Sequence, residues 1–399
     1  MWNQEQDSEL LKILSKLRQT FHTYPELSGQ EKQTRETIRK FLQELGIETQ
    51  TFNEQYGLCG LIKGEQSGPV IALRADMDAL PITEENEVAY KSKHQGVMHA
   101  CGHDGHMAIL MGAAKMLMQN RHKLAGTVKL IFQPAEEASP LGGAKAMIEA
   151  GVLEGVDAIF GLHLWPEVPS GALGIRTGGF MAASDRFKIN VIGRSAHAAQ
   201  PHKGIDAITM SADIIQGLNN IVSRQIDPVD VATISIGEIS GGERYNVIAQ
   251  EVILGGTIRT LNETTRQEIP KRIEAVLKGI AKPQGGDYIF DYQQGYPALA
   301  NCKKATEVVV QAGKKVIGEN NVYAEIKPVL GAEDFANYLA EKSGAFFFLG
   351  CAKAGEPTPI LHNSHFDIDE NVLLIGSKLL YQVVFEGVEA YKIVGGEVG

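Results

Sequence analysis

One short segment, residues 127–137, gives the clearest indication of the fold of this chain. It reads TVKLIFQPAEE. Its first six residues are mostly apolar and partly β-branched, which is typical of a buried strand. Two carboxylates, Glu136 and Glu137, follow just past the end of that strand. Since an open α/β sheet binds its ligands beyond the ends of its strands, these two side chains are candidates for a functional site.

Similar apolar runs lie on both sides of this segment, at 58–62, 70–74 and 158–164, with helix patterns at about 105–118 and 142–150. A helix pattern also covers about 7–45; it is interrupted near Pro25 and contains a candidate capping box at Ser28–Glu31. After Pro297 the same character returns, with helix patterns at about 304–317, 333–342 and beyond 370, and an apolar run at 345–349. Alternating buried strands and helices predict an α/β fold with a mostly parallel sheet.

The pattern differs between these two parts of the chain. Phe187, Ile189 and Val191 alternate with polar residues, as in a half-exposed strand. Further strands at 232–238, 252–259 and 288–293, with helices at 205–224 and 264–280, complete a ferredoxin-like βαββαβ order. We therefore predict a main domain formed by residues 1–183 and 295–399, and an inserted domain formed by residues 184–294.

The composition limits the class of protein. A chain of 399 residues is long enough for two domains, and its net charge of −10, without a basic run, disfavours nucleic acid as a partner. No segment reads as a signal peptide or as a membrane span of about 20 apolar residues. The four cysteines are scattered, which is typical of reduced thiols. We therefore expect a cytoplasmic protein with no membrane partner.

The segment MHACGHDGH, residues 98–106, is the first of several clusters of metal-binding side chains. Cys101 and His103 are two residues apart, so in extended backbone they face the same side and form half of a metal site. Glu136 and Glu137 face different sides, so one can bind metal while the other acts as a general base. Glu137 as ligand and Glu136 as base is our interpretation; the pattern also permits the reverse.

Three more features lie at strand ends or in loops. His163 is near the end of the strand at 158–164, and either His362 or His365 can supply an imidazole from the loop before the last helix. Asp76 or Asp78 can hold a ligand histidine in its tautomer. Each feature is weak by itself, but together they provide enough ligands for two metal ions about 3.5–4 Å apart.

Five segments together resemble the M20 metallopeptidase family: RADMDALP (74–81), MHACGHDGH (98–106), FQPAEE (132–137), GLH (161–163) and LHNSHF (361–366). Within it the chain is similar to the aminoacylase and amidohydrolase subfamily, which includes hippurate hydrolases and N-acetylcysteine or N-acetyldiaminopimelate deacetylases. The resemblance implies Glu136 as general base and His365 as a neighbour of the site. It implies five metal ligands: Cys101, His103, Glu137, His163 and His362.

The resemblance also assigns roles outside the metal cluster. The inserted domain is expected to be a lid that mediates a homodimer, with His197 reaching the partner's active site; His202 is the alternative. Asn246 and Arg259 match positions that hold a substrate carboxylate, a role that suits the bidentate guanidinium of arginine. Glu333 either contacts substrate or caps the helix expected at 333–342.

The expected activity is hydrolysis of the amide bond of small N-acyl amino acids, with a dipeptidase or aminopeptidase as the alternative. Two divalent transition metal ions per subunit are expected. The soft thiolate of Cys101 favours Zn, Co or Ni, Mn is also compatible, and the identity is left open. A thiol enzyme that uses Cys101 as its nucleophile is a third hypothesis.

Overall fold

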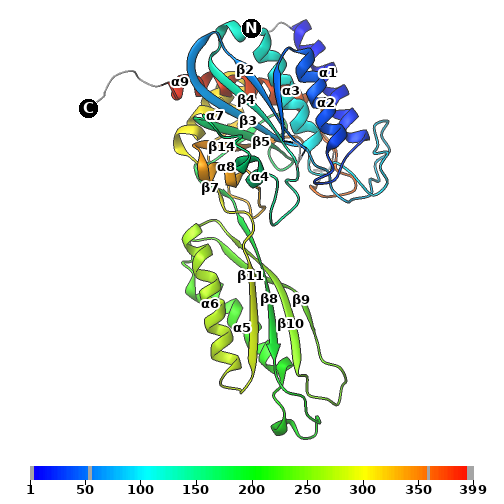
Figure 1. The fold of residues 1–399 in the computed structure, drawn as a ribbon, viewed down its shortest axis with the longest axis vertical. Coiled ribbons are helices and arrows are strands. Elements are labelled where there is room, and N and C mark those ends of the chain that lie inside the picture. The colour runs from blue at the N-terminus through cyan, green and yellow to red at the C-terminus, as the bar shows by residue number, and fades with distance from the viewer. Residues whose placement is uncertain (1–3, 53–55, 357–359, 393–399) are drawn as a thin grey trace, which may run out of the picture. The chain divides into compact units, whose positions relative to one another are not determined.

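The computed structural model describes residues 4–52, 56–356 and 360–392 (Figure 1). Its contacts divide the chain into two compact units. The main unit comprises residues 1–178, 300–327 and 334–399, and the inserted unit comprises residues 179–299 and 328–333. The predicted insert, residues 184–294, lies within the second of these units.

The main unit contains an eight-stranded sheet in the order β1-β2-β4-β3-β5-β14-β6-β13. Its four central strands, β4, β3, β5 and β14, run parallel to one another, and antiparallel pairs flank them. This confirms the predicted mixed α/β fold with a mostly parallel sheet. The strands are β1 (Glu48–Phe52), β2 (Gly57–Lys63), β3 (Gln66–Asp76), β4 (Ala125–Gln133), β5 (Ala158–Trp165), β6 (Leu173–Gly174), β13 (Val322–Tyr323) and β14 (Gly344–Gly350).

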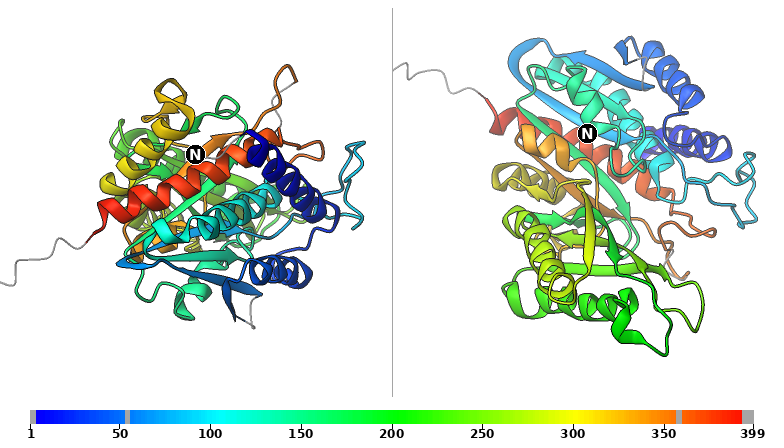
Figure 2. Two further views of the ribbon diagram at one scale, coloured as in Figure 1. Left: turned by 90° about the horizontal axis from the view of Figure 1, so that it is seen from above. Right: turned by 60° about the horizontal axis from the view of Figure 1, so that its bottom comes forward.

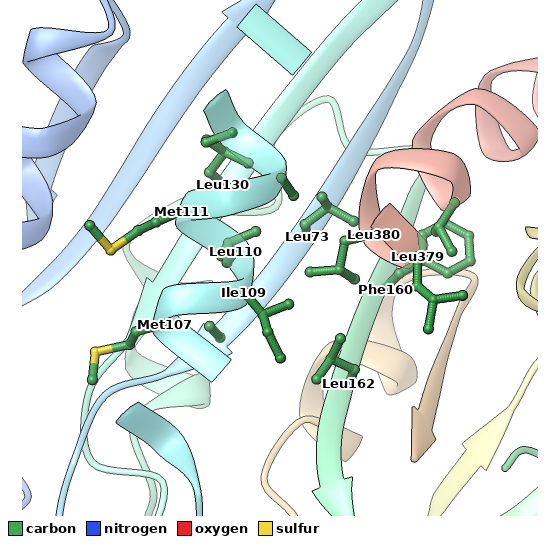
Figure 3. Close-up of a cluster of buried hydrophobic side chains, with 14 of the residues drawn as sticks. Leu73, Met107, Ile109, Leu110, Met111, Leu130, Phe160, Leu162, Leu379 and Leu380 are labelled. Carbon is green, nitrogen blue, oxygen red and sulfur yellow. The ribbon is translucent and has the colours of Figure 1, made fainter. Parts of the chain in front are cut away.

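Helices pack on this sheet and on each other. They are α1 (Gln4–Thr23), α2 (Lys32–Glu44), α3 (His103–Gln119), α4 (Ala144–Glu149), α7 (Lys303–Ile317), α8 (Ala336–Glu341) and α9 (Asn371–Ala390). Figure 2 shows α3 and α9 side by side, and both contact β3. Buried side chains from α3, α9 and the central strands form one cluster (Figure 3); among them are Leu73, Ile109, Leu110, Leu130, Phe160, Leu162, Leu379 and Leu380.

Within the described residues, α9 is the one helix whose length and composition would suffice to cross a membrane. However, 56% of its most apolar window is buried inside the protein. Val383 and Val384 lie in the same buried cluster as the sheet residues. The apolar character of α9 is therefore that of a core helix.

The inserted unit is a four-stranded antiparallel sheet in the order β11-β8-β10-β9, with two helices that pack on each other and on the sheet. The chain order is β8 (Ala183–Ile192), α5 (Ala207–Gln225), β9 (Ala232–Gly241), β10 (Glu251–Thr260), α6 (Glu263–Ala281) and β11 (Asp287–Gln293). This is the expected βαββαβ order. Phe187, Ile189 and Val191 are buried against the helices, as their alternation predicts. The short strands β7 (Gly178–Met181) and β12 (Leu299–Asn301) lie where the chain passes between the units.

Two local expectations were wrong. The capping box does not form, because α2 begins at Lys32 after Glu31, and no side chain of that N-cap residue bonds the helix. Instead, the Glu26 carboxylate accepts the N–H groups of Gln33 and Thr34. The helix expected at 333–342 is shorter, since α8 covers only Ala336–Glu341, so Glu333 does not cap it.

Candidate metal centre

The parallel strands bring the predicted ligand residues together at one edge of the sheet. β4 ends just before Glu136 and Glu137, His163 lies near the end of β5, and α3 begins at His103. Their ligand atoms form two groups, within each of which all atoms lie within 4.8 Å of one another. The groups are Cys101, His103 and His163, and Cys101, Glu137 and His362. All five predicted residues are therefore in one cluster, and Cys101 belongs to both groups.

Cys101 lies between the two groups. Its Sγ is 3.5 Å from His163 Nε2 and 3.3 Å from His362 Nε2, and His362 Nε2 is 3.1 Å from Glu137 Oε1. Burial, then Glu137 and Glu136, raise the pKa of the Cys101 thiol well above its usual value. A cation bound among these groups would reverse this effect, since a coordinated thiol is deprotonated. One sulfur shared between a group with two imidazoles and a group with one imidazole and one carboxylate suits a pair of transition metal ions.

The histidines present the correct nitrogen to such an ion. His103 donates its Nδ1–H to the Asp78 carbonyl (2.9 Å) and His163 donates its Nδ1–H to the Leu164 carbonyl (2.8 Å). A carbonyl can only accept, so Nδ1 carries a proton in both rings and Nε2 is the nitrogen left to face an ion. At His103 an ion would take the place of any proton on Nε2. His103 Nε2 is buried and has no hydrogen-bond partner within the described parts of the chain. A buried ring nitrogen without a hydrogen-bond partner suits a metal ligand.

The charge states of these histidines follow from their surroundings. Burial lowers the pKa of His103, but Asp76 and Asp78 outweigh it and raise this pKa to about 10. Burial, and then the neighbouring His106, hold the pKa of His163 well below its usual value. His163 is therefore neutral at physiological pH, which is the form that binds metal.

The aspartates of RADMDALP hold the histidines, as expected from the sequence. The Asp78 carboxylate lies 3.5 Å from His103 Nδ1, and Asp76 Oδ1 lies 2.6 Å from His106 Nδ1. His106 Nε2 accepts the N–H of Leu164 (2.9 Å). Both nitrogens of His106 are thus occupied, so this imidazole supports the end of β5.

The two glutamates have different surroundings. Glu137 belongs to the group with Cys101 and His362, and both glutamates belong to a further group with His103. Glu136 is buried, and its Oε1 accepts the N–H of Asp334 at 3.3 Å. Of the two glutamates, Glu137 alone shares a group with Cys101 among the described residues, and their roles as ligand and general base stay predictions.

The two histidines of the LHNSHF loop also differ. His362 has a positive φ of 61°, and its N–H bonds the Ala100 carbonyl (2.8 Å), which holds it beside Cys101. His365 is largely exposed, and its Nδ1 lies 3.5 Å from a carboxylate oxygen of Glu85. Of the two candidates that the sequence left open, His362 is the one placed in the cluster.

Two buried ionic networks that the sequence did not reveal support the cluster. Arg74 donates to Asp76 (2.7 Å), Asp334 (2.9 Å) and Gln133 (2.9 Å), joining the ends of β3 and β4 to the segment before α8. At the start of α3, Arg18 and His22 of α1 contact Asp104 at 2.8 and 2.7 Å. The only signal in the sequence was the unusual position of Arg74 at the end of an apolar run.

The remaining predicted residues lie in the inserted unit. His197 is paired with Val247 in an isolated bridge, and its Nδ1 accepts the N–H of Ala199 (3.0 Å). Asn246 directly precedes Val247, and its buried Oδ1 has no hydrogen-bond partner among the residues described. Arg259 lies on β10, where burial and then Arg186 lower its pKa. Glu333 is buried, and His202 lies in an exposed turn. Their functional roles stay predictions.

Comparison with known proteins agrees with this site. Residues 72–386 match the family described as Peptidase family M20/M25/M40. The chain is 41% identical over 375 residues to N-acetyl-L-cysteine deacetylase of Bacillus subtilis (strain 168), covering 94% of this chain and 88% of that protein. It is also 41% identical over 368 residues to thermostable carboxypeptidase 1 of Saccharolobus solfataricus, covering 90% and 92%.

A solved structure is similar over the same extent. The YXEP protein of Bacillus subtilis, described as a dinuclear metal binding peptidase from the M20 family, has a TM-score of 0.84 and 37% identity. The match covers 96% of this chain and 99% of that chain. These similarities confirm the resemblance drawn from the sequence and the prediction of a hydrolytic enzyme. The chain belongs to the M20/M25/M40 peptidase family.

Proposed function

We propose that this chain hydrolyses the amide bond of small N-acyl amino acids with the help of two divalent metal ions. The observation that carries the proposal is the pair of ligand groups that share Cys101, with the carboxylate of Glu136 left over beside them. Similarity to a deacetylase that acts on N-acetyl-L-cysteine supports an acylated amino acid as the substrate.

Cys101, His103, Glu137, His163 and His362 would hold the two ions, and Zn, Mn, Ni or Co suits a donor set of sulfur, imidazole and carboxylate. When bound, such ions supply a water of lowered pKa and polarise the carbonyl of the amide. The protein contributes three buried donors, Cys101, His103 and His163, and two histidines whose Nδ1 is held by a backbone carbonyl, which lose little freedom when the ions bind.

In this proposal Glu136 takes a proton from the attacking water and returns it to the leaving amine, as a general base and then a general acid. Asn246 and Arg259 bind the carboxylate of the amino acid, so that the acyl group alone varies among substrates. His197 donates a hydrogen bond to the oxygen of the scissile carbonyl, from the partner subunit of a dimer.

The substrate class is tested by a hydrolysis panel. Metal-loaded enzyme should cleave N-acetyl, N-benzoyl and indole-acetyl amino acids, and it should cleave free dipeptides much more slowly. The reason is that the acyl group of a free dipeptide carries a charged ammonium group, which is costly to remove from water unless a carboxylate pairs with it. Liberated amino acid is measured for both sets. Faster cleavage of dipeptides would instead support the dipeptidase alternative. The similarity to a carboxypeptidase is the reason for including dipeptides in the panel.

We also propose that the chain forms a homodimer through the inserted unit. β9 is an edge strand of its sheet, and Val229, Ile239 and Tyr245 in and around it are exposed. Apolar side chains beside a free strand edge are typical of an interface. Sedimentation equilibrium should give twice the mass of the chain, and Ile239→Lys should shift it toward the monomer. A wild-type monomer at micromolar concentration would contradict the proposal.

The cytoplasmic location expected from the sequence stays a prediction.

A further inference from the structure

Glu31 is a buried carboxylate whose presence the reaction does not explain. It lies just before α2, far along the chain from the metal ligands, and it is fully buried. Its Oε1 accepts the N–H of Ala135 at 2.8 Å. Its Oε2 is also buried and has no hydrogen-bond partner among the residues that the structure describes. Burying a carboxylate with one unpaired oxygen costs free energy, so a compensating role is expected for Glu31.

The contact that Glu31 makes is at an unusual backbone position. Ala135 has φ of +57°, in the left-handed region that residues with a side chain rarely adopt. The next two residues are Glu136 and Glu137, whose side chains carry the proposed base and one ligand. The direction of both side chains therefore depends on Ala135 keeping this conformation.

Three successive N–H groups of this turn are bound by two carboxylates. Ala135 donates to Glu31, while Glu136 and Glu137 donate to the two oxygens of Asp78 at 3.0 and 2.9 Å. Such a run of amides in a turn forms a concave anion-binding nest, here occupied by the protein's own side chains. Ser28 donates to the same Asp78 carboxylate at 2.6 Å. The segment before α2 therefore contacts the nest twice, through Ser28 to Asp78 and through Glu31 to Ala135.

From this geometry we infer that Glu31 is a positioning residue, which holds Ala135 in the left-handed conformation and thereby directs Glu136 and Glu137 toward the metal cluster. The expected effect of Glu31 on the rate of hydrolysis rests on the proposed function. Its expected effect on metal binding does not depend on that function. Burial, and then repulsion by the Asp78 carboxylate, raise the pKa of Glu31 to about 7. Glutamine at this position keeps the acceptor oxygen and removes that repulsion.

The test compares four variants with the full-length, metal-loaded wild type. Glu31→Ala should lower kcat and weaken metal binding, each by about 10–100-fold, as is typical when a group that orients metal ligands is lost. KM should change little, since the substrate contacts remain. Glu31→Gln should stay close to wild type in both properties. Metal binding is measured by competition with a chromogenic chelator, which needs no substrate.

A second substitution tests the backbone part of the inference. Glycine adopts a positive φ without strain, so adding Ala135→Gly to Glu31→Ala should restore part of the lost metal affinity and kcat. The matched control is Glu26→Ala, which removes the acceptor for Gln33 and Thr34 at the start of α2 but leaves the bond to Ala135. It should destabilise α2 and leave kcat and metal affinity unchanged.

Circular dichroism confirms that each variant is folded before it is compared. Wild-type metal affinity and kcat in folded Glu31→Ala, or an equal loss in Glu26→Ala, would overturn the inference. If the wild type cleaves no N-acyl amino acid, the proposed function fails. The comparison of metal affinities still decides the role of Glu31 in that case.

Discussion

Glu136→Gln is expected to lower kcat by about 10²–10⁴-fold, the usual contribution of a general base to a proton transfer. Glutamine has nearly the same size and keeps an oxygen for the Asp334 N–H, which now lies 3.3 Å from Glu136 Oε1. The loop should therefore keep its shape, and both metal ions should stay bound. Metal content by elemental analysis and turnover of an N-acyl amino acid check the two parts of this expectation.

The matched variant is Glu137→Gln, made at the neighbouring position. Glu137 lies in the group with Cys101 and His362, so its loss should reduce metal affinity before it affects proton transfer. The reverse pattern, with metal lost from the Glu136 variant, would exchange the two roles. A chelator should abolish wild-type activity and added metal restore it. Activity that survives the chelator but is lost on alkylation would favour Cys101 as a nucleophile.

Arg74→Met should lower the free energy of unfolding of the main unit by about 3–5 kcal/mol, the typical loss when one partner of a buried ionic cluster is removed. The guanidinium is fully buried and contacts Asp76, Asp334 and Gln133. Methionine fills the space but leaves two carboxylates buried without their cation. Urea denaturation of the metal-free protein measures the change.

Two comparisons make this prediction specific. Arg74→Lys keeps the charge but cannot reach three acceptors with one ammonium group, so its loss should be intermediate. Arg39→Met removes a partly exposed pair with Glu36 and should leave the unfolding midpoint nearly unchanged. Equal shifts for Arg74→Met and Arg39→Met would show that the buried cluster contributes no more than a surface ion pair.

Periodicity in the sequence predicted most of the elements for a simple physical reason. The apolar run at 127–132 is buried in the structure as β4, and the alternation of Phe187, Ile189 and Val191 reflects a sheet with one covered face. Local chemistry was a poorer guide at Ser28 and Glu31, which match a capping box. These side chains bond Asp78 and Ala135 instead. These contacts join residues that are 50 and 104 positions apart, so a local sequence pattern does not reveal them.

The sequence by itself determined the α/β class, the βαββαβ insert and the residue types available to bind metal. It did so because strand and helix periods, and the donor chemistry of Cys, His and Glu, are properties of the local chain. The local pattern left His362 and His365 open; tertiary structure placed His362 beside Cys101 and Glu137, and it placed Cys101 in both ligand groups. Those outcomes depend on parallel strand ends, buried ion pairs and a left-handed Ala135, which exist only once distant segments are packed together.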